Sequence, residues 1–173
     1  MSLAEIISRQ TMEKNEQKLK EHNNDVLPLD VYHSPWLRFY KKLSEKSIKI
    51  CGKWALYFNT KSLMNEVWKV AIKSLIEDKL YGVQSLECST NYVGQSGGLC
   101  SIGMLIFVCD VSPNEDNEEI IMNVGKNILE IFNYDERQSI YYKSKQLSGT
   151  TIPTSTNYTY KLNNHLYIKK LKI

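Results

Sequence analysis

Two amphipathic helical segments set between apolar strand segments constrain the fold of this 173-residue chain most strongly. Residues 62–78 and 120–132 place apolar side chains three and four positions apart, a period that predicts helices with one buried face. Runs rich in aromatic, β-branched and other apolar residues precede and follow them. The predicted strands are residues 52–58, 83–90, 102–109 and 138–144. The predicted order is therefore β-α-β-β-α-β.

This order predicts an α+β protein with a ferredoxin-like, split β-α-β-β-α-β antiparallel sheet. Two right-handed crossovers would place both helices on one face of that sheet. The opposite face then needs a cover, which we expect from an aromatic helix at residues 34–43 or from another subunit. We expect an additional C-terminal strand at residues 165–173, at an edge of the sheet. We expect a long loop at residues 149–164, which are rich in Thr, Ser and Asn.

One domain with an N-terminal extension is the expected organisation. A hydrophobic content of 42% suits one core, and two full domains would be cramped. Residues 4–22 predict a helix with a thin apolar stripe, and residues 26–35 form a connection with two prolines. We therefore divide the chain into an N-terminal helix and linker, residues 1–35, and a single α+β domain, residues 36–173.

Charge and cysteine usage narrow the classes of partner. A net charge of +3 does not favour a nucleic-acid-binding groove and is compatible with an anionic small ligand. The four cysteines form no C-x-x-C pair, and three lie within or beside apolar runs, which predicts reduced, packed thiols. No apolar run approaches the roughly 18 residues of a membrane span. We expect a cytoplasmic protein without membrane or direct nucleic-acid partners.

The histidines predict neither a metal site nor a cysteine–histidine nucleophile. His22, His33 and His165 lie in a polar helix end, a linker and the tail, outside the predicted sheet framework. We therefore expect no metal site. Glu87 within a predicted strand and Asp110 at a strand end are the carboxylates that a sheet would hold rigidly, although a helix cap or a surface ion pair is the more common single role for each.

The segment 138–149 is the strongest candidate for a ligand site. It begins as a β-rich run that includes Tyr142, becomes cationic at Lys143 and Lys145, and ends at Gly149, as a strand leading into a ligand loop would. An exposed edge strand with a solvated tip is the alternative. The chain has 11 tyrosines, most of which we expect to pack as ordinary amphipathic residues. A cluster of them at one edge, interleaved with these lysines, could stack a base, which suggests a nucleotide-like ligand.

Short motifs in residues 80–149 resemble the phage-type S-adenosylmethionine (SAM) lyases, including type III CRISPR relatives that degrade the signal molecule SAM-AMP. The matching landmarks are Leu-Tyr-Gly at residues 80–82, Tyr92, an apolar strand ending at Cys109, and residues 142–149. The resemblance implies homotrimers of ferredoxin-like subunits with the ligand at the subunit interface. It also implies a cofactor-free reaction that would switch off a CRISPR-type signal in antiviral defence.

In this family the methionine carboxylate of the substrate attacks its own γ-carbon and expels methylthioadenosine, leaving homoserine lactone. By resemblance, Tyr92 and Glu87 would be the catalytic residues. The implied substrate-binding residues are Tyr81, Asp110, Tyr142, Lys143, Ser144, Lys145, Ser148 and Gly149. The family places a glutamate just before the apolar strand, where this chain has residues 100–102 without a carboxylate. Either Glu87 or Asp110 substitutes, or the ammonium of the ligand is held differently.

A second resemblance involves the segment 52–54, Trp68, Leu80 and the segment 142–143. These residues are similar to a bacterial and archaeal domain family named for phosphothreonine lyase, whose relatives have a cap-binding-like fold. Packing of both tryptophans between the first strand and the first helix is the alternative explanation. The sequence therefore predicts a SAM or SAM-AMP lyase, with two alternatives: a non-catalytic module that binds a nucleotide or second messenger, and a phosphothreonine-lyase-domain protein.

Overall fold

A single antiparallel sheet organises the computed structural model, which describes residues 26–41, 51–93, 102–111, 117–133, 138–144, 152–154, 158–163 and 167–169. The strands are β1 (Trp36–Tyr40), β2 (Gly52–Phe58), β3 (Val83–Ser89), β4 (Gly103–Cys109), β5 (Ile140–Ser144), β6 (Tyr160–Leu162) and β7 (Tyr167–Lys169). The helices are α2 (Met64–Ile76) and α3 (Glu118–Ile131), with short 3-10 turns η1 (Pro28–Asp30) and η2 (Lys61–Leu63). Within these residues the strand order is β1-β3-β4-β2-β5-β6-β7.

The α+β class is confirmed, and the sheet is larger than the predicted one. The four predicted strands lie in the order β3-β4-β2-β5, so the connection from β2 through α2 to β3 passes over β4. Strand β1 adds to the β3 edge, and β6 and β7 extend the sheet beyond β5. The additional C-terminal strand expected within residues 165–173 is thus present as β7.

The aromatic helix predicted at residues 34–43 is wrong, because its core forms strand β1. This strand pairs antiparallel with β3, from Trp36 opposite Ser89 to Tyr40 opposite Ser85. Leu37 is buried in the main core, whereas Arg38 is exposed, which is the two-residue alternation of a strand. Aromatic residues also fit a pleated surface well. Pairing at an available sheet edge therefore prevails over the helical periodicity.

Two further predictions concern the chain ends. The long loop predicted at residues 149–164 is wrong in its second half, where β6 pairs with β5 and buries Tyr160 and Leu162. The helix predicted at residues 4–22 lies outside the described residues. The connection that follows packs on the sheet domain, since Val31 is buried and the Leu29 N–H donates to Asn65 Oδ1 of α2 at 3.0 Å.

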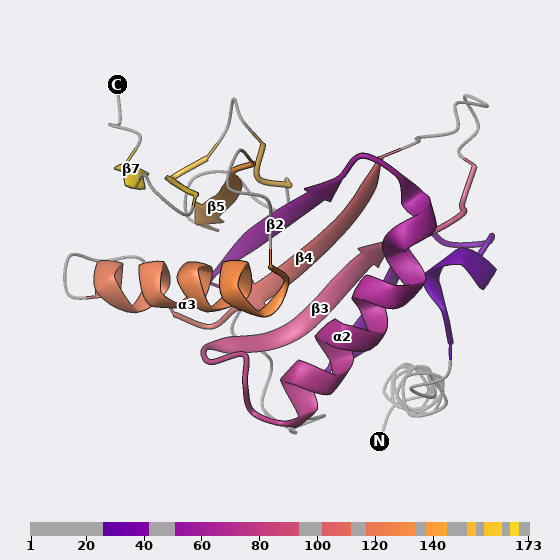
Figure 1. Cartoon of the computed structure of the whole chain (residues 1–173), viewed down its shortest axis with the longest axis horizontal. Helices are drawn as coiled ribbons and strands as arrows, with labels where there is room; N and C mark the ends of the chain where they lie inside the picture. Colours follow the sequence, from indigo (N-terminus) through magenta and orange to yellow (C-terminus); the bar gives the residue numbers. More distant parts are fainter. Residues whose placement is uncertain are drawn as a thin grey trace, which may run out of the picture.

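The main core lies between the sheet and the two helices. Figure 1 shows α2 and α3 on the same side of the sheet. Trp54 and Leu56 of β2 project to this side and pack in one cluster with Trp68 of α2 and Ile128 of α3, so the two tryptophans are core residues. Within the described residues neither helix covers the opposite side, which we call the helix-free face.

Tyr142 closes one end of this core against Gly52. Its ring lies 5.3 Å from that of Trp54 and 5.7 Å from that of Tyr160, and its hydroxyl donates to Val111 O at 3.3 Å. Burial raises the pKa of Tyr142 far above its ordinary value. A Cβ at Gly52 would overlap the Tyr142 hydroxyl oxygen, so only glycine fits beside this ring.

Gly52→Ala is expected to lower the free energy of unfolding by about 2–3 kcal/mol, because the rigid Tyr142 ring and the backbone oxygen of Lys143 cannot both move away. Gly103→Ala is the matched control, since its nearest neighbour is the flexible end of Met64 and the loss should be about 1 kcal/mol. Chemical denaturation of both variants measures the difference. Equal losses would contradict the packing described for Tyr142.

Candidate functional site

Strand alternation sends a set of polar and aromatic side chains to the helix-free face. In β2, Trp54 and Leu56 enter the main core, so Lys53 and Tyr57 project to the other side. A small apolar cluster of Ala55, Ile106 and Val108 forms the floor of this face. In β5 the same rule places Tyr141 and Lys143 on the helix-free face.

Three charged residues on this face form what we call the charged cluster: Arg38, Lys53 and Glu87. Glu87 Oε1 accepts from Arg38 Nε at 3.2 Å, and Glu87 Oε2 accepts from Lys53 Nζ at 2.8 Å. The side chains of Glu87 and Lys53 are only 12% and 14% exposed, against 53% for Arg38. Glu87 is thus a mostly buried carboxylate with a cation on each oxygen.

The ion pair between Lys53 and Glu87 spans a strand. Lys53 is on β2 and Glu87 on β3, and β4 lies between them. Their register partners on β4 are Val108 and Ile106, so the Lys53 stem must pass above this apolar floor to reach the carboxylate. Removing one partner of a mostly buried pair typically costs about 3–5 kcal/mol, because the other charge is left uncompensated. The cluster is therefore held firmly in place.

Three tyrosines form the aromatic cluster beside it: Tyr57, Tyr141 and Tyr158. The Tyr141 ring centroid lies 6.4 Å from that of Tyr57 and 5.5 Å from that of Tyr158, in edge and tilted arrangements. All three side chains are half-buried. The Tyr57 hydroxyl donates to the Pro153 carbonyl, which ties this cluster to the segment before β6.

Lys143 connects the two clusters. It pairs directly with Lys53 across β2 and β5 and lies two positions from Tyr141 on the same face. Like charges directly opposite on neighbouring strands repel each other, and Lys53 instead reaches toward Glu87. With Lys143 the two clusters form what we call the sheet-face site. Counting only the residues that the structure describes, three cations and one carboxylate contribute a net charge of +2, which suits an anionic ligand with a flat aromatic part.

The structure divides the predicted loop residues between the two faces of the sheet. Lys143 lies on the helix-free face, whereas Tyr142 and Ser144 are buried on the helix side. Successive residues of a strand point to opposite faces, so these three side chains do not line one surface. Lys145, Ser148 and Gly149 lie outside the described residues.

The remaining predicted residues are spread along β3. Glu87 lies within the strand, Tyr81 precedes it and Tyr92 follows it, and the seven residues of β3 span about 24 Å. A single copy of the chain therefore does not bring Tyr81 and Tyr92 to one small ligand. Asp110 is near the Tyr81 end, where its carboxylate accepts from Gln84 Nε2.

Tyr92 follows a segment that is tied to the start of the described chain. The Thr90 hydroxyl donates to Ser34 O, and the Asn91 N–H donates to Val31 O at 3.1 Å. Thr90 Oγ1 also accepts from the Tyr92 N–H at 3.2 Å. The Tyr92 side chain is 36% exposed, so these contacts fix its backbone while its ring remains accessible.

The described cysteines are buried thiols, and the described acidic residues form no metal-binding cluster. Cys51, Cys88 and Cys109 are buried and form no disulfide with one another, in keeping with the predicted packed thiols. Burial raises the pKa of the Cys88 thiol to about 12, which keeps it protonated and unreactive. Among the described residues no group of three or more His, Cys, Asp or Glu is placed to hold a metal ion.

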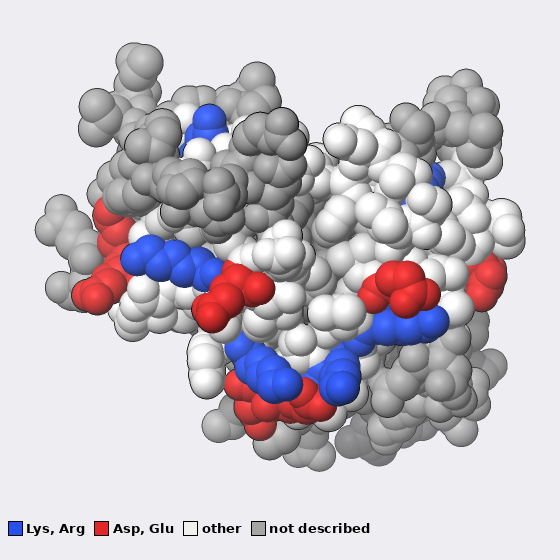
Figure 2. Space-filling model, in the orientation of Figure 1, with Lys and Arg blue, Asp and Glu red and all other residues white. Residues whose placement is uncertain are grey.

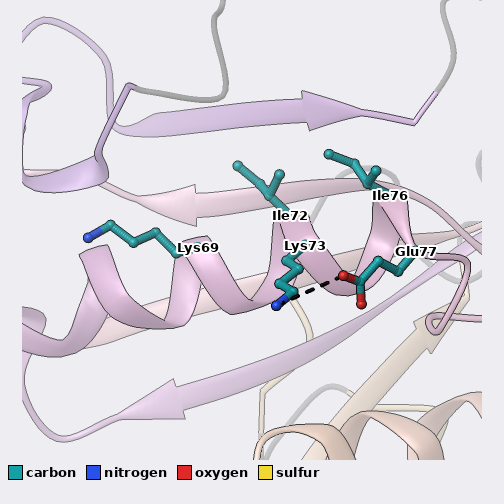
Figure 3. Close-up of a pocket in the computed structure, with 5 residues that line it drawn as sticks. All are labelled: Lys69, Ile72, Lys73, Ile76 and Glu77. Carbon is teal, nitrogen blue, oxygen red and sulfur yellow. Dashed lines mark ion pairs between the residues drawn. The ribbon is translucent and has the colours of Figure 1, made fainter.

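A shallow hollow on the helix side lies apart from these residues. It is lined by α2 and the residue after it, at Lys69, Ile72, Lys73, Ile76 and Glu77, with Lys73 and Glu77 in an ion pair of 3.9 Å (Figure 3). Figure 2 shows basic and acidic side chains interspersed over this side of the molecule. The hollow contains no predicted site residue, and its single-helix wall offers little to orient a ligand.

Sequence reasoning did not assign Arg38, Lys53, Tyr57, Tyr141 or Tyr158 to the site. The signal was available for Lys53 and Tyr57, because they alternate with Trp54 and Leu56. Arg38 could not be found, since its segment was predicted to be a helix. The partnership between β1 and β3 appears only in the folded sheet.

The fold and site define a class: an α+β protein with helices on one side of a single antiparallel sheet and a polar, aromatic surface on the other. Its fold is similar to that of a solved Ascaris suum protein, in the "Complex crystal structure of Ascaris suum eIF4E-3 with m7G cap". The TM-score is 0.51 at 10% identity, over 81% of this chain and 77% of the other.

No family model and no curated protein matches the chain. The likeness to eIF4E-3 thus concerns the fold alone. It does not bear on the SAM lyases. No helix among the described residues is long and apolar enough to cross a membrane.

Proposed function

We propose that this protein binds a nucleotide-type small molecule on the sheet-face site. The observation that carries the proposal is the shared placement of Lys53, Lys143 and Tyr141, each of them partly exposed, on one face of the sheet. Lysine ammonium groups form strong charge-assisted hydrogen bonds with phosphate oxygens. Tyrosine rings provide flat surfaces for a base, and stacking of one base on an aromatic ring is worth about 1–3 kcal/mol.

The fold likeness supports the same class of ligand. The Ascaris suum protein is in complex with an m7G cap, which is a methylated purine nucleotide. A ligand of this kind combines a flat base with phosphates, and the sheet-face site combines tyrosines with a net positive charge. The predicted alternative of a nucleotide or second-messenger binding module is therefore the function that the geometry supports best.

Lys143→Ala is expected to weaken the binding of ATP or 7-methyl-GTP about tenfold, because it removes one charge-assisted contact worth about 1.5 kcal/mol. Isothermal titration calorimetry on the purified chain measures the change. Lys69→Ala is the matched control, since it removes an equal charge from the helix side. The proposal fails if neither nucleotide binds, or if both variants lose affinity equally while thermal midpoints stay unchanged.

A second candidate is the SAM or SAM-AMP lyase that the sequence resemblance implies, built on a ferredoxin-like core. The reaction forms a carboxylate C–O bond while the C–S bond breaks, and the electron pair goes to sulfur as the sulfonium is neutralised. Orientation and removal of water accelerate such a step, and tyrosines can face the sulfonium. Both candidate substitutes for the missing glutamate already have partners, because Asp110 accepts from Gln84 and Glu87 accepts from Arg38 and Lys53.

The separation of Tyr81 and Tyr92 supports the interface site of this second candidate. These residues lie beyond opposite ends of β3 in one copy, so a ligand that contacts both needs another subunit. A homotrimer with a shared site would provide this arrangement. Light scattering at micromolar concentration that shows only monomer would exclude such a shared site.

Incubation with SAM and with SAM-AMP tests the lyase directly. Mass spectrometry should detect methylthioadenosine or its AMP conjugate together with homoserine lactone. Tyr92→Phe should lower turnover at least tenfold, roughly 1.4 kcal/mol of transition-state stabilisation, while Tyr32→Phe, a change on an exposed ring, should not. Binding without any product would exclude the lyase and leave the binding module.

A further inference from the structure

Lys53 is positioned between two competing electrostatic partners. Its ammonium lies 2.8 Å from Glu87 Oε2, on the β3 side, while its backbone is in register with Lys143 on β5. An anion bound between Lys53 and Lys143 would therefore attract the same ammonium that Glu87 holds. A lysine ammonium has three donors on a flexible stem, so it can turn toward such an anion.

Glu87 is a mostly buried carboxylate on the helix-free face. Arg38 and Lys53 each contact one of its oxygens, and only 12% of its side chain is exposed. Its negative charge offsets part of the positive charge that a phosphate would meet. Because the surroundings are half-buried, this offset is less screened than it would be between exposed groups. The repulsion between Glu87 and the ligand grows with the negative charge of the ligand.

From this arrangement, and resting on the proposed nucleotide-binding function, we propose that Glu87 is the specificity-determining residue that limits how much negative charge the sheet-face site accepts. It does so by holding Lys53 and by repelling additional phosphates. The site thereby favours ligands with few negative charges, such as a nucleoside monophosphate or a nucleotide that also carries a cationic group. Polyphosphates bind less tightly than the three cations alone would allow.

The test compares adenosine, AMP and ATP binding to the wild-type chain and to Glu87→Gln by calorimetry. The amide keeps the size of the side chain and removes its charge. Affinity should rise about tenfold for ATP, about threefold for AMP and not at all for adenosine, because the released repulsion scales with ligand charge. A uniform change for all three ligands, or weaker ATP binding, would overturn the proposal.

The wild-type chain gives a second arm that does not depend on the folding of Glu87→Gln. Because Glu87 holds Lys53 and repels additional phosphates, ATP should bind the wild-type chain no more tightly than AMP. Tighter binding of ATP than of AMP would overturn the proposal. If no nucleotide binds any variant, the proposed function fails; if nucleotides bind in a Lys143-dependent manner without these charge effects, only the role of Glu87 fails.

Discussion

The two-residue alternation of β2 is the constraint on which the rest of the structure depends. This strand pairs with β4 on one side and β5 on the other, so each of its side chains belongs to a row that crosses the sheet. Trp54 anchors the core beneath α3, where a Cβ at Gly125 would stand 2.7 Å from its ring. Lys53, one position earlier, points to the opposite face and reaches Glu87. A shift of one residue in the pairing register of β2 would move its core side chains to the helix-free face and its polar side chains into the core.

The helix-free face carries charge on a sheet surface that no helix of the described residues covers. Its apolar floor is small, and charged residues around it compensate one another through Glu87. Such pairs add little stability compared with an apolar core, since desolvation offsets much of their attraction. Under the proposed function, these pairs would instead position charge for a ligand with complementary charge. The charged cluster and the tyrosines together form the surface on which we propose that the ligand binds.

The sequence was sufficient for the elements that have a clear period, and insufficient for pairing between distant segments. Helices α2 and α3 and strand β2 follow their predictions closely, because their apolar spacing is regular. Strand β1 was predicted to be a helix, since four aromatic or apolar residues within five positions fit either period. For the site, alternation alone could have separated Lys143 from Tyr142 and Ser144. The ion pairs of Glu87 require the order of β1, β3, β4 and β2, which long-range packing decides.

We propose above all that the ligand binds on the helix-free face. A heteronuclear NMR titration with a purine nucleotide tests it most directly, because each backbone amide reports its own environment. We predict the largest shift changes at Lys53, Tyr141 and Lys143, with little change in α2. Changes centred instead on the hollow between Lys69 and Glu77 would contradict this location.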